Sequence, residues 1–314
     1  MSSLQMVPTS VHRFLKLPQY VEEVTPGTTP NSAVFIDASV INSIRATYAN
    51  ATEMYRKLGS RKMYKYIKMG EDLTWTMSFS PVDTTLIRYG TENGNPTGTL
   101  AGTIDKHITM ANSRYTNTWT QNGPLIEQFF LRKGSKCDSI TVTTTSRGML
   151  VVDMDMISLD VVINQTAPSG GLTTPQWVVS PTTATPWSNL AGGCGNKLTI
   201  GGVSYPFKTA SFTVNNNLDS LDVDGCDNIV WLEAGAKETT FTAEILAQKD
   251  NAIENAMDAG NGLPATLVLN ATGPKVATFT NLFINNKTED QDAGDTSAAT
   301  YTISGTADDV SVSA

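Results

Sequence analysis

Two carboxylates, Asp153 and Asp155, are the residues of this sequence best placed to do chemistry together. They occupy alternate positions of a segment with the pattern of a β-strand, so they share one face, about 7 Å apart. Paired carboxylates can act as general acid and base in glycosidases. The polar side of an alternating strand also carries such residues without any catalytic role, and the pair equally suits an acidic surface. The sequence therefore predicts an acidic pair on one sheet face and leaves its role open.

Other catalytic or metal-binding residue types are scarce. The chain has two histidines and three cysteines, which excludes a three-histidine zinc site, and the cysteines show no C-x-x-C spacing. Neither His12 nor His107 neighbours a Ser, Cys or Asp arrangement typical of an activated nucleophile. The acidic stretch 219–228 imitates part of a calcium loop but lacks the bidentate Glu at its twelfth position. We therefore expect no enzyme activity and no catalytic, cofactor-binding or metal-binding residues; whether Cys194 pairs with Cys226 stays open.

Charge is unevenly distributed along the chain. The net charge is −8, yet residues 1–165 hold 16 basic and 14 acidic residues, whereas residues 166–314 hold 6 and 16. A net acidic protein is a poor general nucleic-acid binder, and the asymmetry favours two units with different surfaces. The basic run 56–65, interleaved with tyrosines, is the one candidate nucleic-acid patch. Given the net charge, a solvated face or a contact with acidic residues of a second subunit explains this run better.

These residues must be positioned by β-strands, because most of the chain alternates between apolar and polar residues. In 73–81, Trp75, Met77 and Phe79 fall on one side and Thr or Ser on the other. Residues 139–162 are typical of a hairpin that turns at 146–148, in whose second strand apolar residues alternate with the two aspartates. The same style continues in the segments 239–247, 265–271 and 276–285.

Helical patterns are few. Residues 80–90 predict one short helix, with Ser80 as its cap and Gly90 as its stop. Residues 249–260 predict another, with Asp250 as N-cap and Gly260 as the end.

The expected organisation has an arm, two domains and a linker. The 91–124 stretch, inside the first domain, reads as a second long loop. Trp177 and Trp187 indicate that the linker packs onto a surface. The four parts are an N-terminal arm 1–38, a first domain 39–164, a Pro/Gly/Thr-rich linker 165–196, and a second domain with a C-terminal tail 197–314.

The two domains resemble each other. Segments 41–95 and 207–262 both contain a short strand, Asn residues, a Gly turn, an alternating strand, a short helix and a Gly/Asn stop. In that comparison the tripeptide 74–76 (Thr-Trp-Thr) aligns with 240–242 (Thr-Phe-Thr). Self-similarity at a long period indicates a repeated architecture, although β-proteins with similar element lengths also align by chance.

Several segments resemble the tail tube proteins of tailed viruses. The opening QYVEEVTPGTTP (19–30) is similar to their extended arm with a Glu and a G-T-T-P turn. Residues 133–161 resemble their hairpin, in which a small-residue strand turns into a long alternating one. The core of these proteins is resembled by 198–225 and by the strand, acidic helix and strand pair that follow as far as 285. The likeness lies in the order of the elements and in short local stretches of sequence, over most of 20–285.

This resemblance implies a mainly β fold: tandem tail-tube-type β-sandwich or barrel domains, each with one short flanking helix, closing into a ring. Stacked rings would form the virion tail tube through which viral DNA passes without specific binding. The apparent repeat favours rings of three chains that imitate six-fold symmetry, with homohexameric rings as the alternative. Implied partners are further copies of the chain, a tape measure protein, and tail terminator and tail-tip proteins, with assembly in the host cytoplasm and no membrane span.

Two sets of residues follow as candidate functional positions. An acidic lumen would repel DNA phosphates, so Asp153 and Asp155 are expected to face it. The arm and the 91–124 stretch are expected to make ring-to-ring contacts. Other tail components (terminator, distal ring or hub), a β-rich receptor-binding adhesin and a carbohydrate-active enzyme remain as alternatives. The candidate inter-ring residues are Phe14, Leu17, Tyr20, Val21, Leu100, Tyr115 and Trp119.

Overall fold

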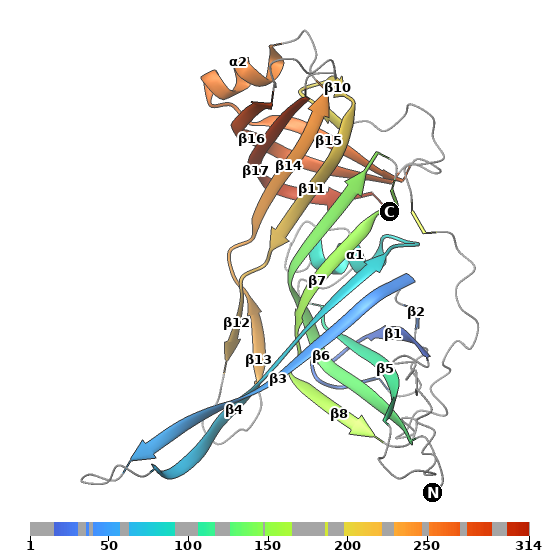
Figure 1. Ribbon diagram of the computed structural model, residues 1–314, viewed down its shortest axis with the longest axis vertical. Coiled ribbons are helices and arrows are strands. Elements are labelled where there is room, and N and C mark those ends of the chain that lie inside the picture. Colours follow the sequence, from blue (N-terminus) through green and yellow to red (C-terminus); the bar gives the residue numbers. More distant parts are fainter. Residues whose placement is uncertain are drawn as a thin grey trace, which may run out of the picture.

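A computed structural model of the chain shows a mainly β protein (Figure 1). Fifteen strands are linked by hydrogen-bonded pairing into one sheet, and two more form a separate ribbon. The mainly β expectation is therefore confirmed, while within the described part of one chain the sheet stays open and closes no barrel. The residues that the structure describes are 16–30, 36–37, 40–56, 63–91, 106–116, 126–146, 148–164, 186–187, 198–221, 229–246, 251–270, 275–290 and 300–313.

The N-terminal group of strands pairs in the order β2-β1-β5-β6-β7-β4-β3, with every pair antiparallel. Helix α1 (Thr85–Thr91) follows β4, and β8 (Asp160–Asn164) pairs with the first half of β6. The seven strands are β1 (Lys16–Glu22), β2 (Ile36–Asp37), β3 (Val40–Arg56), β4 (Met63–Ser80), β5 (Ile108–Thr116), β6 (Ile126–Thr145) and β7 (Val151–Ile157).

The C-terminal group pairs in the order β10-β9-β15-β16-β17-β14-β11, again antiparallel throughout. Helix α2 (Ala252–Ala259) follows β14, as α1 follows β4. A separate ribbon of β12 (Leu218–Leu221) and β13 (Trp231–Ala234) lies in the chain between β11 and β14. The other strands are β9 (Leu198–Ile200), β10 (Val203–Tyr205), β11 (Phe207–Asn215), β14 (Glu238–Leu246), β15 (Leu263–Asn270), β16 (Lys275–Asp290) and β17 (Thr300–Val312).

The two groups share their irregularities as well as their order of pairing. A β-bulge is a specific feature of a strand pair, so its recurrence at one place is informative. The β3–β4 register shifts between residues 41 and 43, and the β11–β14 register shifts between 207 and 209. Comparable shifts occur between 137 and 139 in β6–β7 and between 284 and 286 in β16–β17. The groups are joined where β6 pairs with β11.

The long strands β6 and β16 each contain one residue in the left-handed region. Gly134 has a φ of 62° and Asn281 a φ of 49°. Both lie in the segment of the strand where its pairing with the preceding strand, β5 or β15, shifts register. Glycine adopts such a φ freely and asparagine is the residue that tolerates it next best. β6 pairs with β5 as far as Ser135 and with β7 from Lys136 onward, whereas β16 pairs with β15 as far as Leu282 and with β17 from Ala277 to Asp290.

The apolar face of the sheet forms one continuous core. As the alternation predicts, Trp75, Met77 and Phe79 are buried, and so are Val152, Met154 and Met156 on β7. The core continues across the joint into the C-terminal strands, where Phe212 and Phe241 each contact the ring of Phe279 edge to face. Large side chains buried in both groups therefore form one core that continues across the joint.

Both helices begin differently from the sequence prediction, and α1 also ends differently. Helix α1 begins at Thr85, where Asp83 Oδ1 accepts the backbone N–H of Thr85 at 2.8 Å, so Ser80 is not its cap. Gly90 lies inside α1 rather than after it. Its role is close packing, because a Cβ at this position would lie 2.7 Å from the nearest side-chain atom of Ile140. The N-cap of α2 is Asn251, not Asp250.

The end of α2 is as predicted: Gly260 is the C-cap, with a φ of 62°.

Two stretches expected to be irregular or extended carry strands. The 91–124 loop prediction is wrong over 108–116, which form β5 between β1 and β6. Its pattern alternates weakly, yet Ile108 and Met110 are buried because strands on both sides order it. Residues 16–30 of the expected arm lie on the chain's own sheet, since β1 pairs with β5 and β2.

Candidate functional site

The most continuous surface feature is a polar face formed by the side of the sheet opposite the core. Residues that lie directly opposite each other in antiparallel pairs share a face, so this face can be followed strand by strand. Asp153 is exposed there, beside hydroxyl residues on both neighbouring strands. One row across the sheet consists of Ser78, Asp153, Thr141, Thr213, Thr240 and Thr306.

The acidic pair lies on this polar face, as the alternation predicted. Asp155 is exposed, lies opposite Thr76, and accepts a hydrogen bond from Ser139 Oγ at 2.8 Å. Glu238 and Glu244 of β14 belong to the same face, through their pairing with Asn215 and Thr209. In the described residues no group of three or more His, Cys, Asp or Glu is arranged to hold a metal ion.

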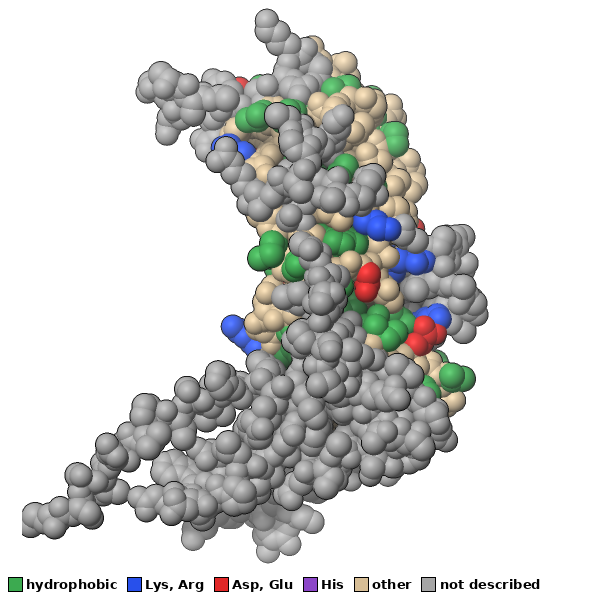
Figure 2. Space-filling view, turned by 90° about the vertical axis from the view of Figure 1, so that its right-hand side faces the viewer, with side chains coloured by type: hydrophobic (Ala, Val, Ile, Leu, Met, Phe, Trp, Pro, Cys, Tyr) green, Lys and Arg blue, Asp and Glu red, His purple; other side chains and the backbone are tan. Residues whose placement is uncertain are grey.

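The described surface carries few charged side chains in a second view of the molecule. In Figure 2 the described part of the surface is mainly uncharged polar side chains and backbone, with basic and acidic side chains scattered over it. Among the described residues, Lys208 pairs with Glu244 at 2.7 Å. The described part of the surface in this view presents no large patch of one sign, and a basic stripe of that kind is what general binding to nucleic acid would need.

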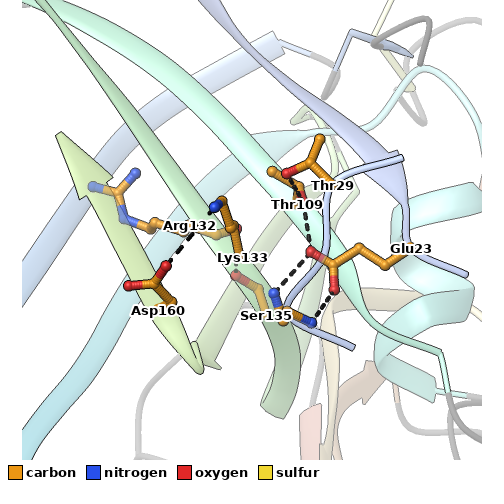
Figure 3. A network of polar contacts seen from close by, with 9 residues as sticks. Glu23, Thr29, Thr109, Arg132, Lys133, Ser135 and Asp160 are labelled. Carbon is orange, nitrogen blue, oxygen red and sulfur yellow. Dashed lines mark hydrogen bonds and ion pairs between the residues drawn. The ribbon is translucent and has the colours of Figure 1, made fainter. Parts of the chain in front are cut away.

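Glu23 attaches the N-terminal segment to the sheet (Figure 3). Its side chain is buried and accepts hydrogen bonds from Gly134 N at 2.9 Å, Thr109 Oγ1 at 2.5 Å and Gly27 N at 2.7 Å. Thr109 also contacts Thr29 through their hydroxyls, at 3.0 Å. A buried carboxylate is stable only with such partners, so the turn that contains Gly27 is held against β5 and β6.

The adjacent Glu22 makes a more exposed contact. It accepts a hydrogen bond from Tyr89 at 2.6 Å and pairs with Lys106. Burial acts to raise the pKa of Glu22, but the hydrogen bonds from Lys106 and Tyr89 outweigh it and hold this pKa below its usual value. Burial, followed by the bond to Glu22, raises the pKa of Tyr89 well above its usual range. β1 is therefore tied to both α1 and the start of β5.

The joint between the two groups is a second well-defined contact. Thr141 Oγ1 and Thr213 Oγ1 lie 2.9 Å apart across β6 and β11. Just beyond the paired residues, Asn216 is buried and donates its side-chain amide to the carbonyls of Cys137 and Gly90, each at 3.0 Å. Its backbone N–H donates to the carbonyl of Asp138 at 2.7 Å. These bonds make the joint specific in register as well as in strand partner.

The β12–β13 ribbon packs back onto the N-terminal group. Leu232 is fully buried with Leu159, and its carbonyl accepts a hydrogen bond from Lys136 Nζ at 3.2 Å. The rings of Trp231 and His107 lie 5.9 Å apart. His107 is buried next to β5, where its Nδ1 lies 3.3 Å from the carbonyl oxygen of Gly134.

Few of the predicted inter-ring residues can be examined. Tyr20 is buried in its own chain, where its ring meets that of Tyr89 edge to face at 6.1 Å, so its side chain belongs to the core and is not free for a neighbouring ring. Val21 is half-buried. Leu17 and Tyr115 lie in β1 and β5, but their side chains are outside the described residues. The candidates Phe14, Leu100 and Trp119 lie outside the described residues altogether.

Other sequence predictions have mixed outcomes. Trp187 packs as expected, with its indole N–H donating to the carbonyl of Val82 at 3.0 Å, whereas Trp177 lies outside the described residues. Cys137 is fully buried, which raises the pKa of its thiol, and the nearby carboxylates of Asp138 and Asp155 add to the effect. The other two cysteines lie outside the described residues, so their pairing stays open.

Sequence reasoning missed Glu23 and Asn216 as structural anchors. Glu23 was part of the quoted arm motif, and an Asn was noted after the short strand in both halves, but no local pattern indicates which distant carbonyl or amide each one meets.

No helix among the described residues is long and apolar enough to cross a membrane.

Comparison with known proteins agrees with a structural β-protein. A search of the curated proteins found no match to this chain. The model of a family described as phage tail tube protein matches residues 19–313, which run from β1 to the end of β17. Since the match extends over nearly the whole chain, this protein belongs to the phage tail tube protein family.

Proposed function

We propose that this protein polymerises as stacked rings into the tail tube, the conduit through which the phage genome leaves the virion. The observation that carries the proposal is the repeated strand order, with its repeated bulges, inside a chain of the tail tube family. Two groups of strands joined edge to edge can occupy two adjacent positions of a ring. On this proposal the groups are tandem tube domains, and β1 and β2 are part of the first.

Three chains per ring are favoured by this arrangement. If each chain supplies two similar units, three chains give a ring with approximate six-fold symmetry. The alternative is a ring of six chains, in which the second group of strands adds to the outside of each subunit. Rings that stack with a constant rotation form an open, helical assembly, which suits a tube.

The polar face of the sheet is proposed to line the lumen. Its acidic side chains, with Asp153 and Asp155 among them, would repel DNA phosphates, and its hydroxyl side chains carry no positive charge that would hold them strongly. DNA could then slide through without specific binding. We further propose that the tube assembles in the host cytoplasm around a tape measure protein, ends at terminator and tail-tip proteins, and has no enzymatic role.

Electron microscopy of the purified full-length protein tests this function. Hollow tubes whose end-on views have three chains per ring are the expected result. Tubes with six chains per ring would keep the function and overturn the proposed use of the repeat. Monodisperse particles that form no tubes at high concentration, alone or with the tape measure protein, would contradict the proposal and favour an adhesin or tail-tip component.

A further inference from the structure

We propose that β3 of one copy pairs antiparallel with the second half of β16 (residues 284–290) of the next copy, in the register that β11 and β6 have inside the chain. The inference rests on the proposed ring function and specifies the contact that closes the ring. The partner surface is therefore a second copy of this chain, and the joint between copies repeats the joint within each copy.

Among the open strand edges in the described part of the chain, two belong to strands whose counterparts in the other group are paired there. β3 pairs only with β4, whereas its counterpart β11 pairs with β14 on one side and β6 on the other. Residues 284–290 of β16 pair only with β17, whereas the corresponding part of β6 pairs with β7 and β11. An unpaired strand edge presents backbone donors and acceptors that another chain can use. These two are the open edges whose counterparts, β11 and β6, pair with each other inside the chain.

The β-bulges determine which residues correspond. Thr47 of β3 lies opposite Thr74, just as Thr213 of β11 lies opposite Thr240. On the other strand the shift after Cys137 matches the shift after Ile284, so Thr141 corresponds to Thr288. Because Thr141 and Thr213 are partners at the internal joint, Thr288 and Thr47 are predicted to be partners between copies.

The residues at these edges suit the proposed register. Asn285, Asn286 and Thr288 are exposed in the single chain, as residues of an open strand edge are. At the joint between copies, Thr47 and Thr288 take the places that Thr213 and Thr141 have at the internal joint. Continuing the same register places Arg45 opposite Asp290, which joins a basic residue to the acidic C-terminal group.

A further match lies at the end of the joint. The counterpart of Asn216 in β3 is another asparagine, Asn50. Asn50 follows Thr47 by three residues, as Asn216 follows Thr213, and it lies opposite Glu71 of β4. Inside the chain, Asn216 caps the carbonyl of Cys137, whose counterpart in β16 is Ile284. The register therefore brings residue 50 of one copy beside Ile284 of the next, as it brings Asn216 beside Cys137 inside the chain.

Disulfide cross-linking tests the register directly. The double variant Thr47→Cys/Thr288→Cys, oxidised after assembly, should give a ladder of covalent multimers on non-reducing gels that ends at the number of chains per ring. A mixture of the two single variants should give covalent dimers only, since each chain then carries one introduced cysteine and can be joined to one other chain. The intrachain variant Thr141→Cys/Thr213→Cys should give an intramolecular bond, which shows that this strand position has suitable geometry.

The matched control is Thr47→Cys/Glu289→Cys, in which the second cysteine is one residue away and on the opposite face. It should cross-link at least about tenfold less, because its side chains point to opposite faces of the sheet and cannot meet the separation a disulfide needs. Equal cross-linking of both pairs would overturn this inference and leave the tube function intact. So would tubes of the Thr47→Cys/Thr288→Cys variant that form no cross-link between copies on oxidation. Absence of rings and tubes in the wild type would overturn both.

Discussion

At the scale of single residues, the neighbouring side chains of Glu22 and Glu23 contribute differently to stability because their surroundings differ. Glu23 is buried and accepts three hydrogen bonds, from β5, from β6 and from its own turn. Glu22 faces outward, with 44% of its side chain exposed, and its contacts with Lys106 and Tyr89 are partly solvated. The sequence motif that contains them does not distinguish the two, but the structure makes Glu23 the anchor.

Replacing this anchor should destabilise the fold. Glu23→Gln keeps the shape but turns one acceptor oxygen into a donor amide that faces other donors, so the free energy of unfolding should fall by about 1–3 kcal/mol. Chemical denaturation at neutral pH measures this loss. Glu22→Gln is the control and should cost less than about 1 kcal/mol, because partly exposed ion pairs are screened by solvent. Equal losses for the two variants would contradict the anchoring role.

The control variant also has an expected pH dependence. Because the folded protein lowers the pKa of Glu22, its contribution is present above the ordinary glutamate pKa of about 4.3 and is lost as the pH falls through the lower folded value. The difference in unfolding free energy between wild type and Glu22→Gln should therefore shrink in acid. A difference that grows as the pH falls would contradict the contacts assigned to Glu22.

At the scale of elements, the strands β6 and β16 depend on one residue each in the left-handed region. Gly134→Ala should destabilise the protein by about 2 kcal/mol or more, since alanine is strained at this φ by about 1–2 kcal/mol. The new Cβ would also lie 2.5 Å from a Leu159 methyl carbon. Asn281→Gly should stay within about 1 kcal/mol of wild type, because glycine adopts this φ without strain. Thermal unfolding of both variants measures the contrast; similar melting temperatures would contradict it.

At the scale of the whole molecule, the arm divides into a docked part and a part outside the described residues. Deleting residues 1–15 should leave folded protein that forms single rings but does not elongate, if this part of the arm makes contacts between rings. Deleting 1–30 is the comparison and should lower the melting temperature, because it removes Tyr20 and Glu23 from the core. Circular dichroism and electron microscopy give the two readouts. Normal tubes from the 1–15 deletion would refute the role of this segment.

The sequence by itself determined the features that depend on neighbouring residues. Alternation placed Asp153 and Asp155 opposite the buried Met154, because side chains of successive strand residues point to opposite faces. The hairpin was predictable over 139–157, although its last predicted residues belong to β8 instead, and so was the end of α2 at Gly260, since turns and caps are local. The alignment of residues 74–76 with 240–242 placed corresponding strands together, and their β-bulges agree.

Tertiary structure alone decided which strands meet. β5 was read as loop because its own pattern is weak, and its order comes from β1 and β6, which are distant in sequence. Tyr20 was expected at a surface, yet β1 docks on the same chain and buries it. The open edges of β3 and β16 follow from the complete set of pairings. Strand pairing is a non-local choice made by the whole sheet, so no short stretch of sequence encodes it.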